Sequence, residues 1–593
     1  MPRGILAAAV ASLALGAVGY GDESWNGPSE QLDSEQPNGH AVQILGSSVV
    51  TIFGTTSTVF EDSVANSASG PTFLMLDSSS GTHTLKVAFD TAIAGEFSDS
   101  LTVSGSANFR TGVLTNGGFS GAQLTKNGGV GELIIDGIPL PDSGASLEGA
   151  VLSVVEGTIS IEGAGGFSPI PSLNKAILIN GANGKLRFGS VTGSGTTFTK
   201  TSVVAALSGT LEHTTATNDT LGGSLTVEMG QILNANITGG SLAVTGSFGG
   251  SLTKNGGGVL RLNGTSVVTT PATTPLVSAG RLEILGPATL GTVPVLSAGA
   301  TLALLSGTGN SVPSAWTLTS GTLEIVPGAL GSATVSLMGG GLRFSASGAA
   351  SSFSNPVTAS GNSAIDVTGM AAQLTALTLQ PGVVLTKTGM GLTATSFVFN
   401  GAGVYTINSS GSDFKIPGSG QVAVSLVKTG SGVLEITGAN TSAATTTVSA
   451  GTIRVGDGGS LPSGAITDNA ELEFNRSTPL TVANAINGSG AVTKRGAGTL
   501  NLNGAQGYAT LNTIAGAGTT NVNGAFTGGT ATVNANATTN FTVSQTLAAL
   551  NIGTTAFAGE SNGFQSAPMV VPEPGVLGLL LIGALGGLSR RRR

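Results

Sequence analysis

The stretch of sequence that decides the fold reads Leu426-Val-Lys-Thr-Gly-Ser-Gly-Val-Leu-Glu-Ile-Thr-Gly438. Close copies read Leu252-Thr-Lys-Asn-Gly-Gly-Gly-Val-Leu-Arg-Leu-Asn-Gly264 and Val492-Thr-Lys-Arg-Gly-Ala-Gly-Thr-Leu-Asn-Leu-Asn-Gly504. A fourth copy at 124–137 has one extra residue in its turn, and a fifth begins at Leu385 and then diverges. Self-similar segments spread over this distance are the mark of a repeat protein.

Each copy predicts two short strands joined by a tight turn. The first strand ends at a lysine, and the following x-Gly-x-Gly segment suits backbone conformations that small residues adopt most readily. In the second strand the apolar residues alternate, so Leu434 and Ile436 share one face and Glu435 lies on the solvent side. Because the lysine recurs with the motif, we expect a structural role at the turn edge rather than catalysis. The motif lysines are Lys126, Lys254, Lys387, Lys428 and Lys494.

A second pattern is more frequent than the first. It consists of a glycine, a small or polar residue, and two aliphatic residues separated by one outward residue. Copies of this pattern are Gly157–Ile161, Gly280–Ile284, Gly321–Ile325 and Gly451–Val455. Many closely spaced strands without helical periodicity predict an all-β fold.

Three all-β architectures differ in how well they fit the repeat. A sandwich gives no reason for motifs that recur over some 400 residues, and a propeller needs an even period near 40 to 50 residues. A parallel β-solenoid tolerates loops of varying length between stacked coils. We therefore expect an elongated parallel β-solenoid.

The lysine motif resembles the autotransporter-associated β-strand repeat. The likeness is strongest at 426–455, where the Lys428 turn is followed by Gly451-Thr-Ile-Arg-Val455. The resemblance implies a right-handed parallel β-helix of the kind found in the passenger regions of secreted proteins. This is the fold that we predict for residues 111–557.

The composition excludes several kinds of site. Charged residues make up 9% of the chain, against roughly 25% in a typical domain. There is no cysteine, which excludes disulfides and thiolate metal sites. The three histidines, His40, His83 and His213, are too far apart in sequence to suggest a metal centre. We expect no cofactor.

The N-terminus, residues 1–21, resembles a secretory signal peptide. Arg3 supplies a positive charge, residues 5–18 form an apolar run, and small residues precede Gly21. The alternative is a buried N-terminal helix, but the abrupt change to an acidic, polar segment at Asp22 favours export.

The C-terminus contains a second candidate targeting signal. An apolar run at 575–588 follows the motif Pro572-Glu573-Pro574, and the chain ends in a basic tail. The run is shorter than the roughly 20 residues that a stable membrane-spanning helix needs. The tail, which would stay on the cytoplasmic side, consists of Arg590, Arg591, Arg592 and Arg593.

This arrangement resembles the PEP-CTERM sorting signal. The family implies recognition by an exosortase-type membrane enzyme, with the C-terminal helix inserted only transiently in the inner membrane. The secretion machinery is then a further partner. Loss of the five terminal arginines would take the net charge from −8 to about −13, which argues against nucleic acid as a partner.

These predictions divide the chain into five parts. Between the signal peptide and the solenoid, residues 22–110 are expected to form an N-terminal cap and the first coils. Residues 558–571 are expected to link the solenoid to the sorting signal at 572–593.

Two classes of function fit this organisation. The first is a non-catalytic, structural or adhesive protein of the cell surface, outer membrane or extracellular matrix, associated with exopolysaccharide or with another cell surface. The alternative is a β-helical polysaccharide lyase or hydrolase, which needs carboxylates held close together. Acids such as Asp136, Asp142, Glu148, Glu156 and Glu162 show no convergence in the sequence, so we expect no enzyme.

Overall fold

The computed structural model describes residues 202–553, apart from gaps at 270–273, 347–350, 370, 418–423, 442 and 515. Before residue 202 it describes strands between Glu23 and Phe198, and after residue 553 it describes Met569–Val571. The expected signal peptide, the sorting signal and most of the expected linker therefore lie outside the described residues.

The described part of the chain folds as an all-β, parallel β-solenoid of the right-handed type. This hand is expected, because a right-twisted strand followed by a crossover to a parallel strand returns to its sheet almost only in that sense. The chain divides into two compact units, Met1–Pro313 and Ser314–Arg593.

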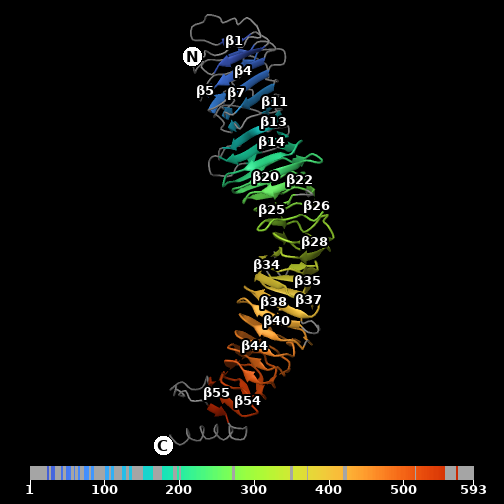
Figure 1. The fold of residues 1–593 in the computed structure, drawn as a ribbon, viewed down its shortest axis with the longest axis vertical. Coiled ribbons are helices and arrows are strands. Elements are labelled where there is room, and N and C mark those ends of the chain that lie inside the picture. Colours follow the sequence, from blue (N-terminus) through green and yellow to red (C-terminus); the bar gives the residue numbers. More distant parts are fainter. Residues whose placement is uncertain are drawn as a thin grey trace, which may run out of the picture. The chain divides into compact units, whose positions relative to one another are not determined.

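Unit 1, residues 1–313, begins with strands that lie in the predicted N-terminal segment. β2 (Ser29–Asp33), β4 (Val49–Gly54), β7 (Phe73–Ser78) and β9 (Ser100–Gly105) pair in parallel, and β9 pairs in turn with β11 (Gln123–Lys126). The described strands of 22–110 are thus already stacked as coils (Figure 1).

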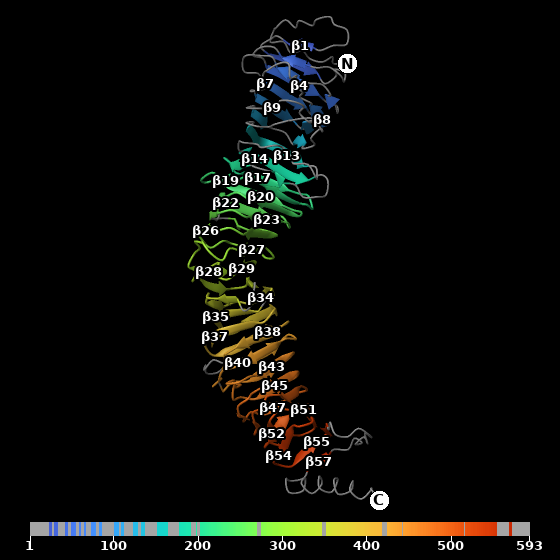
Figure 2. The same cartoon turned by 180° about the vertical axis from the view of Figure 1, so that it is seen from behind.

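Further along unit 1, two parallel ladders continue the stack (Figure 2). Members of one ladder are β12 (Glu132–Asp136), β13 (Val151–Gly163), β14 (Ile177–Ser190), β17 (Gly209–His213), β20 (Ile232–Ile237) and β22 (Phe248–Asn255). Members of the other are β18 (Asn218–Leu221), β21 (Ser241–Val244), β23 (Val259–Leu262), β25 (Arg281–Ile284) and β27 (Thr301–Leu304).

In unit 2, residues 314–593, the strands form three parallel ladders. The first ladder contains β29 (Thr322–Ile325), β31 (Gly341–Ala346), β34 (Ser363–Gly369), β36 (Val384–Gly389), β38 (Gly403–Ser409), β40 (Val424–Thr429), β42 (Thr446–Val448), β44 (Ile466–Asp468), β47 (Ile486–Asn487) and β50 (Gln506–Gly507). The second contains β35 (Ala372–Leu379), β37 (Leu392–Phe399), β39 (Phe414–Ile416), β41 (Val433–Ile436), β43 (Thr452–Val455), β45 (Glu471–Phe474), β48 (Ala491–Lys494), β51 (Thr510–Thr513), β53 (Thr530–Val533) and β56 (Ala549–Ile552). The third contains β46 (Leu480–Val482), β49 (Leu500–Leu502), β52 (Thr519–Val522) and β54 (Thr538–Phe541).

One pair in unit 2 runs the other way. β57 (Met569–Val571) is antiparallel to β55 (Gln545–Leu547), with Val571 opposite Gln545. β57 occupies the last three residues of the expected linker, directly before Pro572.

The core consists of aliphatic columns, one inward residue from each coil. Leu434 pairs with Ile453, and Ile453 pairs with Leu472. All three side chains are fully buried, and Ile436 is 2% exposed, whereas Glu435 is partly exposed. The alternation predicted for the repeat is therefore confirmed.

The glycines of the repeat turn are fixed by both conformation and stacking. Gly256 and Gly430 have φ values of 77° and 75°, in the left-handed region that favours glycine. A Cβ atom on Gly256 would lie 2.4 Å from the carbonyl oxygen of Ile237 in the preceding coil, and one on Gly430 would lie 2.5 Å from that of Ser409. A side chain at either position would push the coils apart.

Candidate functional site

The motif lysines are buried in the coils, and the ammonium groups of four of them bind the turn that follows. Lys428 Nζ donates to the carbonyl oxygens of Thr429 at 2.6 Å and Gly430 at 2.7 Å. It also donates to Ala450 O at 3.2 Å, one coil further along. The ammonium thus ties together two consecutive coils of unit 2 through their backbone.

The same arrangement recurs in unit 1. Lys254 Nζ donates to Asn255 O and Gly256 O, each at 2.7 Å, and to Ala279 O in the next coil at 3.3 Å. Gly280 follows Ala279 with a φ of 67°, and a Cβ there would lie 2.4 Å from Gly256 O. The glycine therefore lets the next coil close tightly over the lysine turn.

These contacts relate the two recurring sequence patterns to each other. Gly451, which opens a copy of the second pattern, covers the turn of Lys428, and a Cβ there would lie 2.9 Å from Lys428 Nζ. In both units, the lysine pattern and the glycine pattern described here thus lie on consecutive coils. Together they form one structural unit, which we call the lysine clasp: the Lys428 turn and its covering residues Ala450 and Gly451.

The other motif lysines are also buried, each at most 2% exposed. Lys387 Nζ donates to Ser412 O at 2.6 Å and to Gly389 O at 3.2 Å. Lys494 Nζ donates to Gly496 O. Lys126 lies at the end of β11 in unit 1.

Burial lowers the pKa of these ammonium groups. The pKa values of Lys254 and Lys428 fall to about 8 because burial penalises the charged form. Burial also lowers the pKa of Lys387 to about 8, although Asp413 and Asp366 oppose the shift. The groups stay largely charged at neutral pH, but their hydrogens already point at carbonyl oxygens. They are placed to hold turns rather than to attack a substrate.

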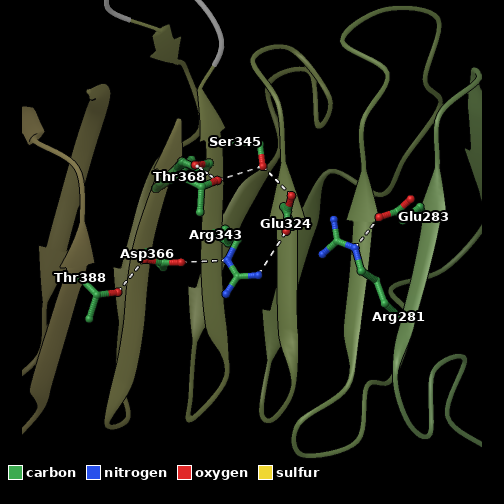
Figure 3. Close-up of polar contacts among 9 residues, drawn as sticks. Arg281, Glu283, Glu324, Arg343, Ser345, Asp366, Thr368 and Thr388 are labelled. Carbon is green, nitrogen blue, oxygen red and sulfur yellow. Dashed lines mark hydrogen bonds and ion pairs between the residues drawn. The ribbon is translucent and has the colours of Figure 1, made fainter. Parts of the chain in front are cut away.

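The outward face of unit 2 carries charges of alternating sign in register. Arg343 in β31 lies between Glu324 in β29 and Asp366 in β34 (Figure 3). Its Nε donates to Asp366 Oδ2 at 2.8 Å, and its Nη1 donates to Glu324 Oε2 at 3.4 Å. Ser345 and Thr388 donate to the same two carboxylates at 2.5 and 2.7 Å. Every carboxylate in this ladder therefore has a basic partner.

A second ladder crosses β39, β41, β43 and β45. Lys415 binds Glu435 at 3.2 Å, and Arg454 binds Glu473 at 2.6 Å and Asp413 at 2.7 Å. Burial opposes the charge of Arg454, but its bond to Glu473 and the two negative charges raise the pKa of its guanidinium. The sequence predicts Glu435 on the solvent side, and parallel register places opposite charges beside it on the neighbouring coils.

Unit 1 has shorter ladders of the same kind. Arg187 binds both Glu132 and Glu212, the latter at 3.0 Å. Arg261 and Arg281 both bind Glu283, at 2.7 and 2.6 Å, and Figure 3 draws the Arg281 contact.

A buried histidine–aspartate pair replaces aliphatic residues at one corner of unit 1. His213 Nε2 lies 2.7 Å from Asp219 Oδ2, and both side chains are fully buried. His213 Nδ1 lies 3.1 Å from Gly239 O. A carbonyl oxygen only accepts, so Nδ1 donates to it, and Nε2 faces the carboxyl group.

This cluster is not arranged for nucleophilic catalysis. Thr215 Oγ1 lies 3.3 Å from Nε2 of His213, the same nitrogen that faces Asp219. A Ser-His-Asp type of relay needs the acid and the nucleophile on opposite ring nitrogens. Thr217 Oγ1 also donates to Asp219 Oδ2, at 2.7 Å, so the carboxylate is held within the corner.

The acids named as enzymatic candidates fall into two groups. Asp142 and Glu148 lie outside the described residues. Asp136 in β12 pairs in register with Glu162 in β13, and Glu156 pairs with Asn183. The Asp136–Glu162 pairing could not be predicted from the sequence, because strand register is set by loop lengths that the motif does not fix.

The remaining candidate residues were predicted for sorting. Pro572, Glu573 and Pro574, and the arginines at 590–593, lie outside the described residues. Among the described residues no helix is long and apolar enough to cross a membrane. Within the same part of the chain, no group of three or more His, Cys, Asp or Glu side chains could hold a metal ion.

Comparison with known proteins identifies one segment. Residues 426–455 match the family model described as Passenger-associated-transport-repeat. The matched segment is the lysine clasp with its flanking strands, from β40 to β43. No curated protein and no solved structure gives a significant match.

Residues 426–455 are similar to a repeat of autotransporter passenger regions. Together with the parallel β-solenoid, this repeat indicates an exported, cell-surface protein.

Proposed function

We propose that this protein is a non-catalytic structural or adhesive component of the cell surface or extracellular matrix, associated with exopolysaccharide. The observation that carries the proposal is the use of its charged side chains. In the described coils, four of the motif lysines bind backbone carbonyls, and several outward carboxylates bind arginine or lysine. These charges hold coils together instead of converging on a substrate.

The proposal is tested by location and by binding. We expect antibody to the solenoid to label intact cells. The purified protein should bind exopolysaccharide from its own cells without shortening it, as measured by co-sedimentation and by the size of the recovered polymer. Depolymerisation would exclude the non-catalytic function, and absence of binding would exclude the association with exopolysaccharide.

We further propose that the protein is sorted through its C-terminus by an exosortase-type enzyme after passage through the secretion machinery. Pro572-Glu573-Pro574 is the recognition element, and the arginines at 590–593 hold the tail on the cytoplasmic side. Strand β57 ends at Val571, the residue before this motif in the sequence.

Replacing Glu573 with alanine tests the sorting proposal. We expect Glu573→Ala to accumulate as membrane-bound precursor, detected by fractionation and intact mass. Glu560→Ala removes an acid from the preceding segment and should be processed normally. Normal release of Glu573→Ala would refute recognition of the motif.

A polysaccharide hydrolase or lyase is the second candidate, and one observation favours it. Asp136 and Glu162 are register partners on adjacent parallel strands. Glycosidases use a pair of acids, and among the acids named above these two are direct neighbours in a ladder. Any depolymerising activity should be lost in Asp136→Asn and kept in Glu156→Gln; equal activity in both variants would exclude this pair as the active site.

A further inference from the structure

The outward face of the third ladder of unit 2 carries amides and hydroxyls where the other ladders carry charges. The segments 499–503, 519–523 and 538–542 share one pattern: threonine, any residue, asparagine, any residue, and then asparagine or threonine. They centre on β49, β52 and β54, near the C-terminal end of the described coils (Figure 2). The residues after the central asparagines are buried, so the asparagines themselves face outward. These buried residues are Leu502, Val522 and Phe541.

Parallel register joins the central asparagines of the three segments into a column. Asn501 pairs with Asn521, and Asn521 pairs with Asn540. Asn521 Nδ2 donates to Asn501 Oδ1 at 2.7 Å, and Asn540 Nδ2 donates to Asn521 Oδ1 at 2.9 Å. A second column runs beside the first, and in it Asn523 Nδ2 donates to Asn503 Oδ1 at 2.8 Å. We call the two columns together the amide face.

The amides of this face keep part of their hydrogen-bonding capacity. A primary amide has two N–H donors and two acceptor lone pairs. Within the described coils, Asn521 uses one donor and one acceptor in its column, and Asn523 does the same, accepting from Thr542 Oγ1 at 2.8 Å. Each therefore retains one N–H and one lone pair, and both side chains are partly exposed. Because the column holds the amides in place, little side-chain entropy is lost when a ligand binds them.

Charge is absent from the coils that carry the amide face. Residues 496–559 contain no aspartate, glutamate, lysine, arginine or histidine. The outward column of the second ladder changes in the same way: it runs through Glu435, Arg454 and Glu473, and its last members among the described strands are Thr532 and Asn551. A charged polymer would find no opposite charge on these coils. Hydroxyl groups, which both donate and accept, match the amides instead.

We propose that the amide face binds a neutral, hydroxyl-rich polysaccharide that lies along the solenoid. This inference rests on the proposed association with exopolysaccharide, and it names the surface and the kind of glycan. The face repeats at the coil spacing of about 4.8 Å, so a polymer of sugar rings, whose units have a similar length, meets the same donors and acceptors at successive coils. A second copy of the chain fits less well, because a dry contact between two such faces would bury the remaining amide groups without partners.

Titration calorimetry of the secreted protein with oligosaccharides tests this surface. The oligosaccharides are prepared by partial hydrolysis of exopolysaccharide from the producing cells and separated on an anion exchanger into neutral and acidic fractions. We expect the neutral fraction to bind, with a Kd that rises about tenfold in Asn521→Leu, because leucine has nearly the shape of asparagine but no hydrogen-bonding group. Asn234→Leu is the matched control: Asn234 is an exposed asparagine of β20 in unit 1, and its replacement should leave the Kd unchanged.

Salt and a second variant separate the outcomes. Neutral recognition predicts the same Kd at about 0.1 M and about 1 M NaCl, because no ion pair is screened. Asn523→Leu tests the second column, and it should also weaken binding even where Asn521→Leu does not fold.

If the parent protein binds the neutral fraction and the leucine variants of the amide face bind it equally well, this face is not the site, whereas the association with exopolysaccharide stands. Binding of the acidic fraction alone would have the same meaning. If the parent protein binds neither fraction, the proposed association fails together with this inference. Self-association in sedimentation velocity that Asn521→Leu and Asn523→Leu abolish would assign the face to a second copy and overturn the proposal.

Discussion

Two lysines of unit 2 show how differently the interior and the outer face use charge. Lys428 is fully buried, and its ammonium group binds three backbone carbonyl oxygens from two coils. The side chain of Lys415 is 43% exposed and binds one carboxylate, that of Glu435. Lys428 therefore holds two coils together, whereas Lys415 makes a single contact at the surface. Substitutions at inner charges should therefore cost more stability than substitutions at outer charges.

The largest effect is expected where a buried polar group loses its partner. Asp219→Ala would leave Nε2 of the buried His213 ring without its carboxyl partner. Breaking a buried pair in this way costs about 3–5 kcal/mol. The free energy of unfolding in urea should fall by that amount.

The control is the double variant His213→Phe, Asp219→Leu, which continues the apolar columns of Phe188 and Leu242. It should recover most of the lost stability, because replacing a whole buried pair by apolar residues is often neutral. A double variant as unstable as Asp219→Ala would show that packing at this corner, not the charge, sets the cost.

The next effect depends on pH and concerns Asp468. Burial raises the pKa of this carboxyl group from 3.8 to about 6. The unfolded chain then loses its proton at lower pH than the folded protein, so stability is full below pH 3.8 and falls as the pH rises to 6. The difference corresponds to about 3 kcal/mol.

Asp468→Asn should remove this loss and be more stable than the parent protein at pH 7, as measured by urea unfolding at a series of pH values. Asp457→Asn is the control, because Asp457 is exposed and binds Ser477 at the surface. If the parent and Asp468→Asn show the same pH profile, the carboxyl group is not desolvated.

The lysine clasp itself should show a smaller but clear effect. Lys428→Met keeps the length of the side chain and leaves the carbonyls of Thr429, Gly430 and Ala450 without their donor. Leaving buried acceptors unpaired costs about 1–3 kcal/mol, so we expect a loss of about 2 kcal/mol at pH 7. The measurement is again the free energy of unfolding.

The same variant has a pH signature. Because the folded pKa of Lys428 is lowered to about 8, its charged form costs stability at neutral pH, and this cost disappears as the pH rises towards 10.5. The parent should therefore gain stability over that range, and Lys428→Met should gain less. Identical gains in both proteins would contradict burial of the ammonium group.

The repeat made the fold predictable, but not the contacts between its copies. Alternation at Leu434 and Ile436 and the glycines around Gly430 determine strands and turn locally, so the coil could be expected from the sequence. The lysine clasp could not be predicted, because the carbonyl oxygen of Ala450 comes from the next coil, whose offset depends on loop length. The same holds for the ladder through Arg454, whose carboxylate partners come from other coils. Inward polar residues such as Asp468 give one usable signal: they interrupt an otherwise aliphatic column.

The smallest effect is expected at Lys415. Lys415→Met removes one exposed ion pair with Glu435, and such pairs contribute about 0–1 kcal/mol. We expect a loss below about 0.5 kcal/mol at low salt. This loss should vanish in 1 M NaCl, where the screening length is about 3 Å. The cost of Lys428→Met should persist at the same salt concentration, because buried charges are screened much less. Urea unfolding of both variants at low and high salt measures the contrast directly. If salt abolished the cost of Lys428→Met as well, the inner lysine would be solvated, and the distinction between clasp and surface contact would fail.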